Sequence, residues 1–310
     1  MKIAVMGSGA VGSYFGARLA QAGEDVAFVA RGRRLAAIRE GGISIVSPRG
    51  DARLESVRVT DDTASIGPVD LVLFTVKLWS TEEAARQLSP LVGPETAVIS
   101  LQNGVEANDV IARTVGREHL MGGVCYIAAA LDHAGAVQHG GKMARLVFGE
   151  PGGRKTRRAE ALLQACARAV AGFDAELSPD IDRVIWEKFV FIVGLSAMTA
   201  LTRRTIGPVR SDPETRAMLL DVMREAVAVG RAKGIDLPAD FPDQRLAFID
   251  TLPAAMTSSM HNDLERGNRL EIGWLSGAVA RLGREVSVPT PANRAVYAAL
   301  KLHADGATQP

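Results

Sequence analysis

Two charged side chains lie in otherwise apolar stretches of the sequence, where a charge is costly to bury. Lys188 is part of residues 186–192, which read WEKFVFI, and Glu271 is part of residues 269–274, which read RLEIGW. An ion pair between them would keep Lys188 charged and oriented, so that its ammonium could donate a proton to a carbonyl oxygen. A salt bridge that only joins two helices explains the same residues equally well. The sequence therefore leaves an acid–base role and a structural role open.

Two further polar residues come directly after predicted strands. Asn103 follows the strand predicted at 96–101, and Lys77 follows the strand predicted at 70–76. Ligands of open α/β folds bind at this carboxyl edge of the sheet, so both residues are candidates for ligand contact. The alternatives are an Asn-Gly turn at Asn103, which turn chemistry favours, and simple solvation of a helix start at Lys77.

A glycine-rich turn connects a strand predicted at 3–6 to a helix predicted at 11–22. The turn consists of Gly7, Ser8, Gly9, Ala10, Val11 and Gly12. Gly7 would make the tight turn, Gly9 would leave room for a pyrophosphate, and Gly12 would let the helix pack closely on the strand. The phosphates would lie on free N–H groups at the helix N-terminus. The pattern predicts a dinucleotide cofactor, and a tight turn without a ligand is the alternative.

Arg31 follows the second predicted strand, 25–30, where an NAD enzyme carries an acidic residue that holds the ribose 2′-hydroxyl. An arginine at this position can pair bidentately with the 2′-phosphate of NADP, and Arg33 or Arg34 could add charge nearby. A basic helix start is the alternative. Because a carboxylate is missing after this strand, the sequence favours NADP over NAD.

Composition and charge exclude several classes of protein. The chain has 310 residues, enough for two domains, and its formal net charge of +1 lacks the basic excess of a nucleic-acid-binding protein. The longest apolar run, 189–201, is shorter than the ~20 residues that span a bilayer, so no membrane segment is predicted. Two cysteines indicate a reducing cytoplasm, and five histidines without paired spacing predict no metal site.

Residues 1–178 alternate strands with helices, which is typical of a Rossmann-type, doubly wound α/β sheet. Within this part we expect a hairpin of 42–46 with 52–59, a helix at 80–91, a strand at 121–130, and an antiparallel pair of 135–140 with 144–149. Pro179 cannot join a central sheet, and Ser178 or Asp180 can cap a following helix, so we place the domain boundary there.

Residues 179–310 are helical in period almost throughout, which predicts an all-helical second domain. The expected helices lie at 183–201, 213–233, 241–251, 259–266, 271–282 and 292–300. The tail from residue 304 to residue 310 is expected to fray.

The motifs together resemble the ketopantoate reductase (2-dehydropantoate 2-reductase) family over nearly the whole chain. The segments that carry the resemblance are GSGAVG at 7–12, Arg31, VK at 76–77, QNG at 102–104, GAVQHG at 135–140, WEK at 186–188, SSM at 258–260 with Asp263, and EI at 271–272. The resemblance implies that Lys188 is the general acid and that Glu271 orients it and lies near the cofactor. It also implies that Ser259 binds the substrate carboxylate and that Asn103 contacts cofactor and substrate.

The resemblance further assigns Lys77 and Ala130 to the cofactor site and makes Arg31 the reader of the 2′-phosphate. One departure concerns the substrate. Family members usually carry asparagines four and eight residues after the catalytic lysine, and this chain has Ile192 and Ser196 there. Because isoleucine cannot form a hydrogen bond, the substrate pocket is expected to be more apolar.

The expected function is the NADPH-dependent reduction of a 2-oxo acid, with 2-dehydropantoate as leading substrate and pantoate as product in pantothenate synthesis. One alternative is a family member that reduces a different, more apolar 2-oxo acid, in line with Ile192. A second is a non-catalytic, NADP-binding regulatory protein, against which the retention of Lys188, Glu271 and Ser259 argues. The expected partners are a small-molecule 2-oxo acid and, in a homodimer, a second copy of the chain, with no nucleic acid and no membrane.

Overall fold

A computed structural model of the chain describes residues 1–307. The chain forms two compact units. The first unit contains Met1–Gln102 and Glu106–Val184, and the second contains Asn103–Val105 and the chain from Ile185 onward. The short segment Asn103–Val105 thus belongs with the second unit, although the strand before it and the helix after it belong to the first.

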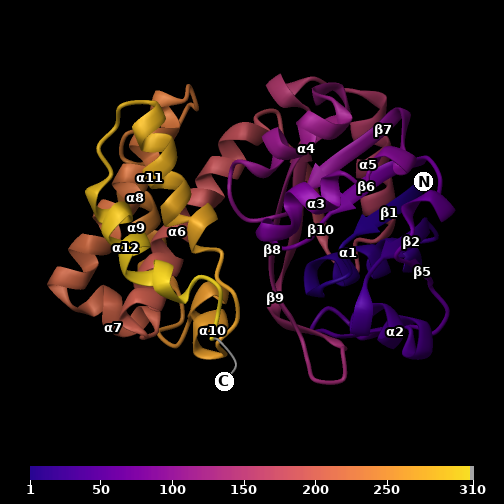
Figure 1. The fold of residues 1–310 in the computed structure, drawn as a ribbon, viewed down its shortest axis with the longest axis horizontal. Coiled ribbons are helices and arrows are strands. Elements are labelled where there is room, and N and C mark those ends of the chain that lie inside the picture. Colours follow the sequence, from indigo (N-terminus) through magenta and orange to yellow (C-terminus); the bar gives the residue numbers. More distant parts are fainter. Residues whose placement is uncertain (308–310) are drawn as a thin grey trace. The chain divides into compact units, whose positions relative to one another are not determined.

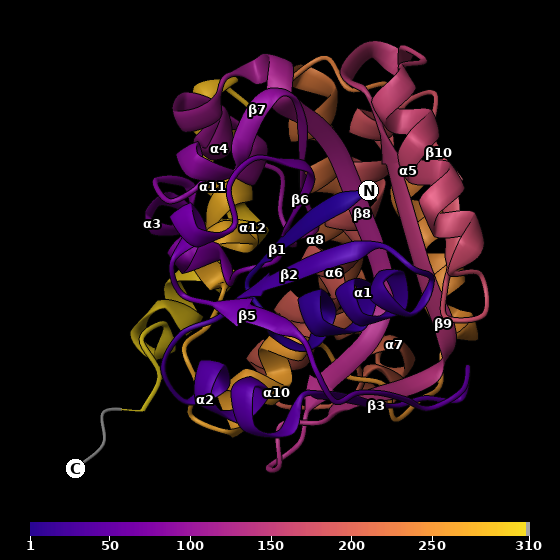
Figure 2. The ribbon, with the colours of Figure 1, turned by 90° about the vertical axis from the view of Figure 1, so that its right-hand side faces the viewer.

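A ten-stranded mixed sheet forms the centre of the first unit (Figures 1 and 2). Its order is β4 (Ala52–Leu54), β3 (Ile43–Val46), β9 (Val137–Gly149), β8 (Leu120–Leu131), β7 (Val92–Ser100), β6 (Val69–Phe74), β1 (Lys2–Met6), β2 (Asp25–Val29) and β5 (Arg58–Thr60), with β10 (Asp174–Leu177) paired to β9. The run from β5 to β8 is parallel throughout. The prediction of a Rossmann-type sheet followed by a helical domain is confirmed.

Both faces of the parallel strands are covered. Along β1, Ile3 and Val5 enter one apolar core, and Ala4 and Met6 enter another, because successive side chains of a strand point to opposite faces. The first core packs against α1 (Ala10–Gln21), α2 (Gly32–Gly41) and α5 (Arg157–Arg168). The second packs against α3 (Thr81–Ala85) and α4 (Ala107–Val115). Figure 2 shows α1 and α3 on either side of the strands.

The antiparallel pair expected between 135–140 and 144–149 is wrong. Both segments belong to the single strand β9, which runs antiparallel to β8 from Leu131↔Val137 to Gly122↔Gly149. The register shifts between Ile127 and Ala128, where the paired residue changes from Ala144 to Gly140. Gly141, with a φ of +72°, lets the extra residues bulge without a chain reversal.

The segment 52–59 also differs from the expectation. Its first part, β4, forms the predicted antiparallel hairpin with β3, but the next strand, β5, leaves that hairpin and pairs in parallel with β2. The helix expected at 80–91 is reduced to α3, between 3₁₀ turns at Leu78–Ser80 and Ser89–Leu91. The helix α4 was not predicted from the sequence.

Helices make up most of the second unit. They are α6 (Ile181–Thr202), which begins in the first unit, α7 (Ile206–Ser211), α8 (Pro213–Ala232), α9 (Phe241–Thr251), α10 (Ser259–Glu265), α11 (Ser276–Glu285) and α12 (Pro291–Leu300). Asp180 caps α6 by accepting a hydrogen bond from the Arg183 N–H at 3.1 Å, which settles the choice between Ser178 and Asp180. The predicted helix 271–282 is a 3₁₀ turn, Ile272–Trp274, followed by α11. The helix α7 was not predicted.

Helix α6 has the length and composition of a membrane span, with 22 residues and a mean hydropathy of 1.7 in its most apolar stretch. However, 61% of that stretch is buried inside the protein. Side chains such as Phe189, Val190 and Val193 pack in the helical core, so α6 is explained as a core helix.

The expected fraying of the tail is wrong for the described part. Ala304 accepts a hydrogen bond from the Leu270 N–H at 2.8 Å, and the Ala307 N–H donates to Gly267 at 2.9 Å. The remainder of that prediction, 308–310, lies outside the described residues.

Candidate active site

The glycine turn 7–12 joins β1 to α1, and its three glycines meet different surroundings. Gly7 has a φ of +101°, and a Cβ there would lie 2.8 Å from the Val76 backbone nitrogen. A Cβ on Gly12 would collide with the Gly7 carbonyl and the Thr75 hydroxyl. A Cβ on Gly9 would meet no protein atom within 4 Å. Internal packing therefore requires glycine at Gly7 and Gly12 but not at Gly9.

Neighbouring strand ends hold this turn in place. The Gly7 N–H donates to the Val29 carbonyl at 3.2 Å, and the Ser8 hydroxyl donates to the same carbonyl at 3.0 Å. From the end of β6, the Thr75 hydroxyl donates to the Gly7 carbonyl at 2.5 Å. The Ser13 hydroxyl donates to the Ser8 carbonyl at 3.0 Å. The turn is thus pre-formed by contacts to β2, β6 and α1.

The residues of the turn fit a dinucleotide. The space beside Gly9 is free of protein atoms, and α1 starts there with N–H groups that have no acceptor within the helix. The first turn of α1 contains no acidic residue, so nothing in it repels a phosphate. This combination is suited to a pyrophosphate approaching the backbone.

Arg34, at the start of α2, stabilises the glycine turn 7–12 by hydrogen bonds. Its guanidinium donates to the Ser8 carbonyl at 2.8 Å, to the Ser13 hydroxyl at 2.9 Å and to the Gly135 carbonyl at 2.6 Å. Burial lowers the pKa of this guanidinium. Because its donors are engaged by the protein, Arg34 positions the loop, whereas the sequence suggested only that it could add charge nearby.

Arg31 lies just after β2, exposed, with its guanidinium paired to a carboxylate. Its Nη1 donates to Glu83 Oε1 at 2.5 Å, and Glu83 is itself exposed on α3. No carboxylate follows β2 along the chain, but the Glu83 carboxylate reaches this position from α3. The only signal in the sequence was an acidic pair, Glu82 and Glu83, in the first turn of a predicted helix.

Gln102 organises the carboxyl edge of the sheet next to this position. Its amide nitrogen donates to the Val76 carbonyl and to the Thr81 hydroxyl, each at 2.8 Å, and its amide oxygen accepts from the Ser100 hydroxyl at 3.0 Å. The ends of β6 and β7 and the start of α3 are therefore tied together. Sequence reasoning used the QNG motif only for Asn103 and missed this role of Gln102.

Three other predicted cofactor residues lie in different settings. Lys77 is exposed beyond β6, with its ammonium 5.5 Å from the centre of the Trp79 ring. Ala130 is exposed near the end of β8, opposite Gln138. Asn103 is half-buried and belongs to the second unit.

In the second unit, α6 carries Lys188, Ile192 and Ser196 at intervals of four residues, so they share one face of the helix. Lys188 and Ile192 are half-buried, and Ser196 is buried. The same face continues to Thr199, whose hydroxyl lies 2.9 Å from the Ser258 hydroxyl. The structure therefore joins this face of α6 to the segment that starts α10.

The two serines at the start of α10 differ in burial and in contacts. Ser258 is buried and caps α10 by accepting from the His261 N–H at 3.0 Å, and His261 Nδ1 lies 2.8 Å from the Thr199 carbonyl. Ser259 is the first residue of α10 and is exposed, which leaves it accessible to a ligand. From the sequence, no role was predicted for Thr199 or Ser258, whose hydroxyls join α6 to the start of α10.

Glu271 lies directly before the 3₁₀ turn Ile272–Trp274 and is 9% exposed. Its carbonyl accepts from the Trp274 N–H at 2.9 Å, which holds its backbone in the turn. A buried carboxylate requires a polar or charged partner. The pairing of Glu271 with Lys188 stays a prediction.

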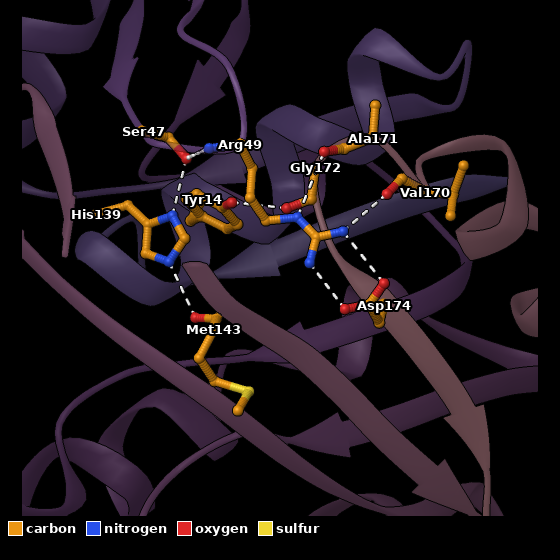
Figure 3. Close-up of polar contacts among 9 residues, drawn as sticks. All are labelled: Tyr14, Ser47, Arg49, His139, Met143, Val170, Ala171, Gly172 and Asp174. Carbon is orange, nitrogen blue, oxygen red and sulfur yellow. Dashed lines mark hydrogen bonds and ion pairs between the residues drawn. The ribbon is translucent and has the colours of Figure 1, made fainter. Parts of the chain in front are cut away.

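His139, from the GAVQHG motif, is part of a buried polar cluster that joins β3 to β9 (Figure 3). Its Nε2 lies 2.9 Å from the Met143 carbonyl, which can only accept, and its Nδ1 lies 2.8 Å from the Ser47 hydroxyl. Nε2 therefore carries a hydrogen, and in the neutral ring Nδ1 accepts from Ser47. Nearby, Arg49 donates to Asp174 at 2.7 Å. With both ring nitrogens engaged, His139 is a structural residue.

Residues 1–307 contain no group of three or more histidine, cysteine or acidic side chains that could hold a metal ion. Cys125 and Cys166 are both buried free thiols. Burial is the main cause that raises the pKa of Cys166 to about 12, so its thiol stays protonated near neutral pH.

Comparisons with known proteins agree with this architecture. Residues 3–153 match the family model for ketopantoate reductase PanE/ApbA, and residues 180–304 match the model for the C-terminal part of that family. A 2-dehydropantoate 2-reductase from Mesorhizobium japonicum is 33% identical over 97% of each chain. A PanE/ApbA family ketopantoate reductase from Ralstonia eutropha, a crystal structure, is 34% identical over 98% of each chain, with a TM-score of 0.87.

A ternary structure of D-mandelate dehydrogenase with NADH and anilino(oxo)acetate shares the fold, with a TM-score of 0.88 at 22% identity and 98% coverage of each chain. The two family models together account for most of the chain and for both units. The protein therefore belongs to the ketopantoate reductase family.

Proposed function

We propose that this protein reduces a 2-oxo acid with NADPH and that 2-dehydropantoate is its leading substrate. The observation that carries the proposal is the pre-formed glycine turn, with open space beside Gly9 and the unshielded N-terminus of α1 next to it. Membership of the ketopantoate reductase family supports an oxidoreductase that uses a nicotinamide cofactor.

The chain's own residues would divide the work as follows. Bound NADPH would provide the hydride that reaches the carbonyl carbon. Lys188 would donate a proton from its ammonium to the carbonyl oxygen, so that the product is a 2-hydroxy acid. Glu271 would orient Lys188, and Ser259 would bind the substrate carboxylate.

The cofactor would be held by the six residues of the turn, by Lys77, Asn103, Ala130 and Glu271, and by Arg31 at the 2′-phosphate. Asn103 would also contact the substrate. Arg31 supports NADPH because a guanidinium binds a phosphate bidentately, and its exposure leaves it accessible.

A second candidate substrate is a 2-oxo acid with a more apolar side chain. The observation that favours it is Ile192, which is half-buried one helical turn from Lys188. The isoleucine side chain cannot form a hydrogen bond with a substrate hydroxyl. The structural neighbour D-mandelate dehydrogenase is named for an aryl 2-hydroxy acid, which makes the corresponding aryl 2-oxo acid a useful test compound.

The test is steady-state oxidation of NADPH against a panel of 2-oxo acids: 2-dehydropantoate, its analogue without the hydroxyl, and an aryl 2-oxo acid. We expect the highest kcat/KM for 2-dehydropantoate. A higher value for either apolar acid would favour the second candidate. Binding of NADPH without turnover of any acid would favour a regulatory protein instead.

We also propose that the protein acts in the cytoplasm, in pantothenate synthesis, and as a homodimer. The mass of the purified protein in solution, measured by light scattering, tests the last point. A monomeric mass at micromolar concentration would reject the homodimer.

A further inference from the structure

Glu83 already occupies part of the Arg31 guanidinium in this structure. The Nη1–Oε1 distance is 2.5 Å, and the two side chains are 48% and 61% exposed. They come from different elements, since Arg31 follows β2 and Glu83 lies on α3, 52 residues later. The pair therefore depends on how α3 is fixed to the sheet.

Helix α3 is firmly attached. Ala84 and Ala85 are 3% and 1% exposed in the core beneath it. At its start, the Thr81 hydroxyl donates to the Leu78 carbonyl at 2.7 Å and accepts from the Gln102 amide at 2.8 Å. The backbone of Glu83 is thus held in place, and only its side chain can move away from Arg31.

We propose that Glu83 is a specificity-determining residue, which lowers the preference for NADPH over NADH that Arg31 creates. This inference rests on the proposed function, in which Arg31 receives the 2′-phosphate. Glu83 acts on the choice between the two cofactors and not on the chemical step.

Glu83 should lower the preference for NADPH over NADH in two ways. A 2′-phosphate must compete with the Glu83 carboxylate for the Arg31 guanidinium, and the nearby carboxylate repels the phosphate. The 2′-hydroxyl of NADH carries no charge, and a carboxylate can accept a hydrogen bond from it, which is the role that an acidic residue after the second strand has in NAD enzymes. Glu83 therefore disfavours NADPH and favours NADH.

Both side chains are half-exposed, so solvent and salt screen the effect. We expect Glu83→Gln to tighten NADPH binding roughly 3- to 10-fold, from the size of an exposed ion pair and a charge repulsion of similar size. Binding of NADH should stay unchanged or weaken.

The chain offers a matched control in the neighbouring residue. Glu82 is exposed on the same helix and pairs with Arg86 at 3.2 Å, one helical turn away. Glu82→Gln changes the net charge by the same amount but leaves the Arg31 pair intact. It should change the ratio of the two dissociation constants by less than about twofold.

The experiment is calorimetric titration of the wild type, Glu83→Gln, Glu82→Gln and Arg31→Ala with NADPH and with NADH, without a substrate. A higher ratio of NADH to NADPH dissociation constants in Glu83→Gln alone supports the inference. An unchanged ratio in Glu83→Gln, or an equal rise in Glu82→Gln, overturns it while the proposed cofactor role of Arg31 stands.

Arg31→Ala separates the two proposals. A selective loss of NADPH affinity in this variant shows that Arg31 reads the phosphate, so a failure of Glu83→Gln then counts against Glu83 alone. No selective loss would reject both the role of Arg31 and the inference built on it. We expect the unfolding temperatures of the four proteins to agree, because these side chains are exposed. Agreement shows that the variants differ in cofactor binding and not in the stability of the fold.

Discussion

The candidate residues of the two units are of different kinds. In the first unit they act mostly through the backbone: carbonyls of the glycine turn accept hydrogen bonds from Thr75 and Arg34, and the Gly7 N–H donates to the Val29 carbonyl. In the second unit they are a row of side chains on α6, Lys188, Ile192 and Ser196, on a face that continues to Thr199, which contacts Ser258.

This difference predicts how each part responds to substitution. A backbone site is shaped by packing, so a change there alters how tightly the cofactor binds and whether the turn forms at all. A side-chain row on one stable helix can exchange single members, so a change there alters the chemistry or the substrate while the fold persists.

Lys188→Ala should lower kcat by about 10²–10⁴-fold, because it removes the proposed proton donor from the α6 face. Binding of NADPH should stay near normal. The measurements are steady-state kinetics and a cofactor titration, with Lys233→Ala, an exposed lysine at the end of α8, as control. Turnover close to that of the wild type would remove Lys188 from the mechanism.

Arg31→Ala should reduce the preference for NADPH over NADH by about 10- to 100-fold, since a charge-assisted contact to the phosphate is lost. The ratio of kcat/KM for the two cofactors measures it. Arg39→Ala, an exposed arginine in the last turn of α2, serves as control and should leave the ratio unchanged. Equal ratios in wild type and Arg31→Ala would contradict the assignment of NADPH.

Gly9→Ala and Gly12→Ala distinguish a ligand site from a tightly packed turn. Gly9→Ala adds a methyl group where no protein atom lies within 4 Å, so the unfolding temperature should hold while NADPH binds about 10- to 100-fold more weakly. Gly12→Ala should instead destabilise the fold by about 1–3 kcal/mol, because its Cβ meets the Gly7 carbonyl. Normal NADPH affinity in Gly9→Ala would show that the pyrophosphate lies elsewhere.

Ile192→Asn should raise the preference for 2-dehydropantoate over its analogue without the hydroxyl by roughly 3- to 10-fold, the size of one added hydrogen bond. The values of kcat/KM for both acids measure the change. Ile192→Val, which adds no hydrogen-bonding group, should leave the ratio as it is. A strong wild-type preference for 2-dehydropantoate that Ile192→Asn does not alter would show that another residue binds the hydroxyl.

Much of the fold could be predicted because its signals are local. Continuous apolar runs such as that of β6 are typical of parallel strands covered on both faces. The helix α9 begins and ends at the predicted residues, 241 and 251. The course of β9 could not be predicted, because Gly140–Gly141 is as typical of a turn as of a bulge, and the pairing with β8 decides between them.

The candidate site shows the same division. The sequence alone determined the glycine turn after β1, the arginine after β2 and the row on α6, because each depends on neighbours within a few residues along the chain. Only the tertiary structure decided that Glu83 pairs with Arg31, that Arg34 braces Ser8 and that Thr199 meets Ser258. These contacts join residues 26 to 59 positions apart, and hydrogen bonds and ion pairs depend on distance in space, which the packing of helices on the sheet and on one another sets.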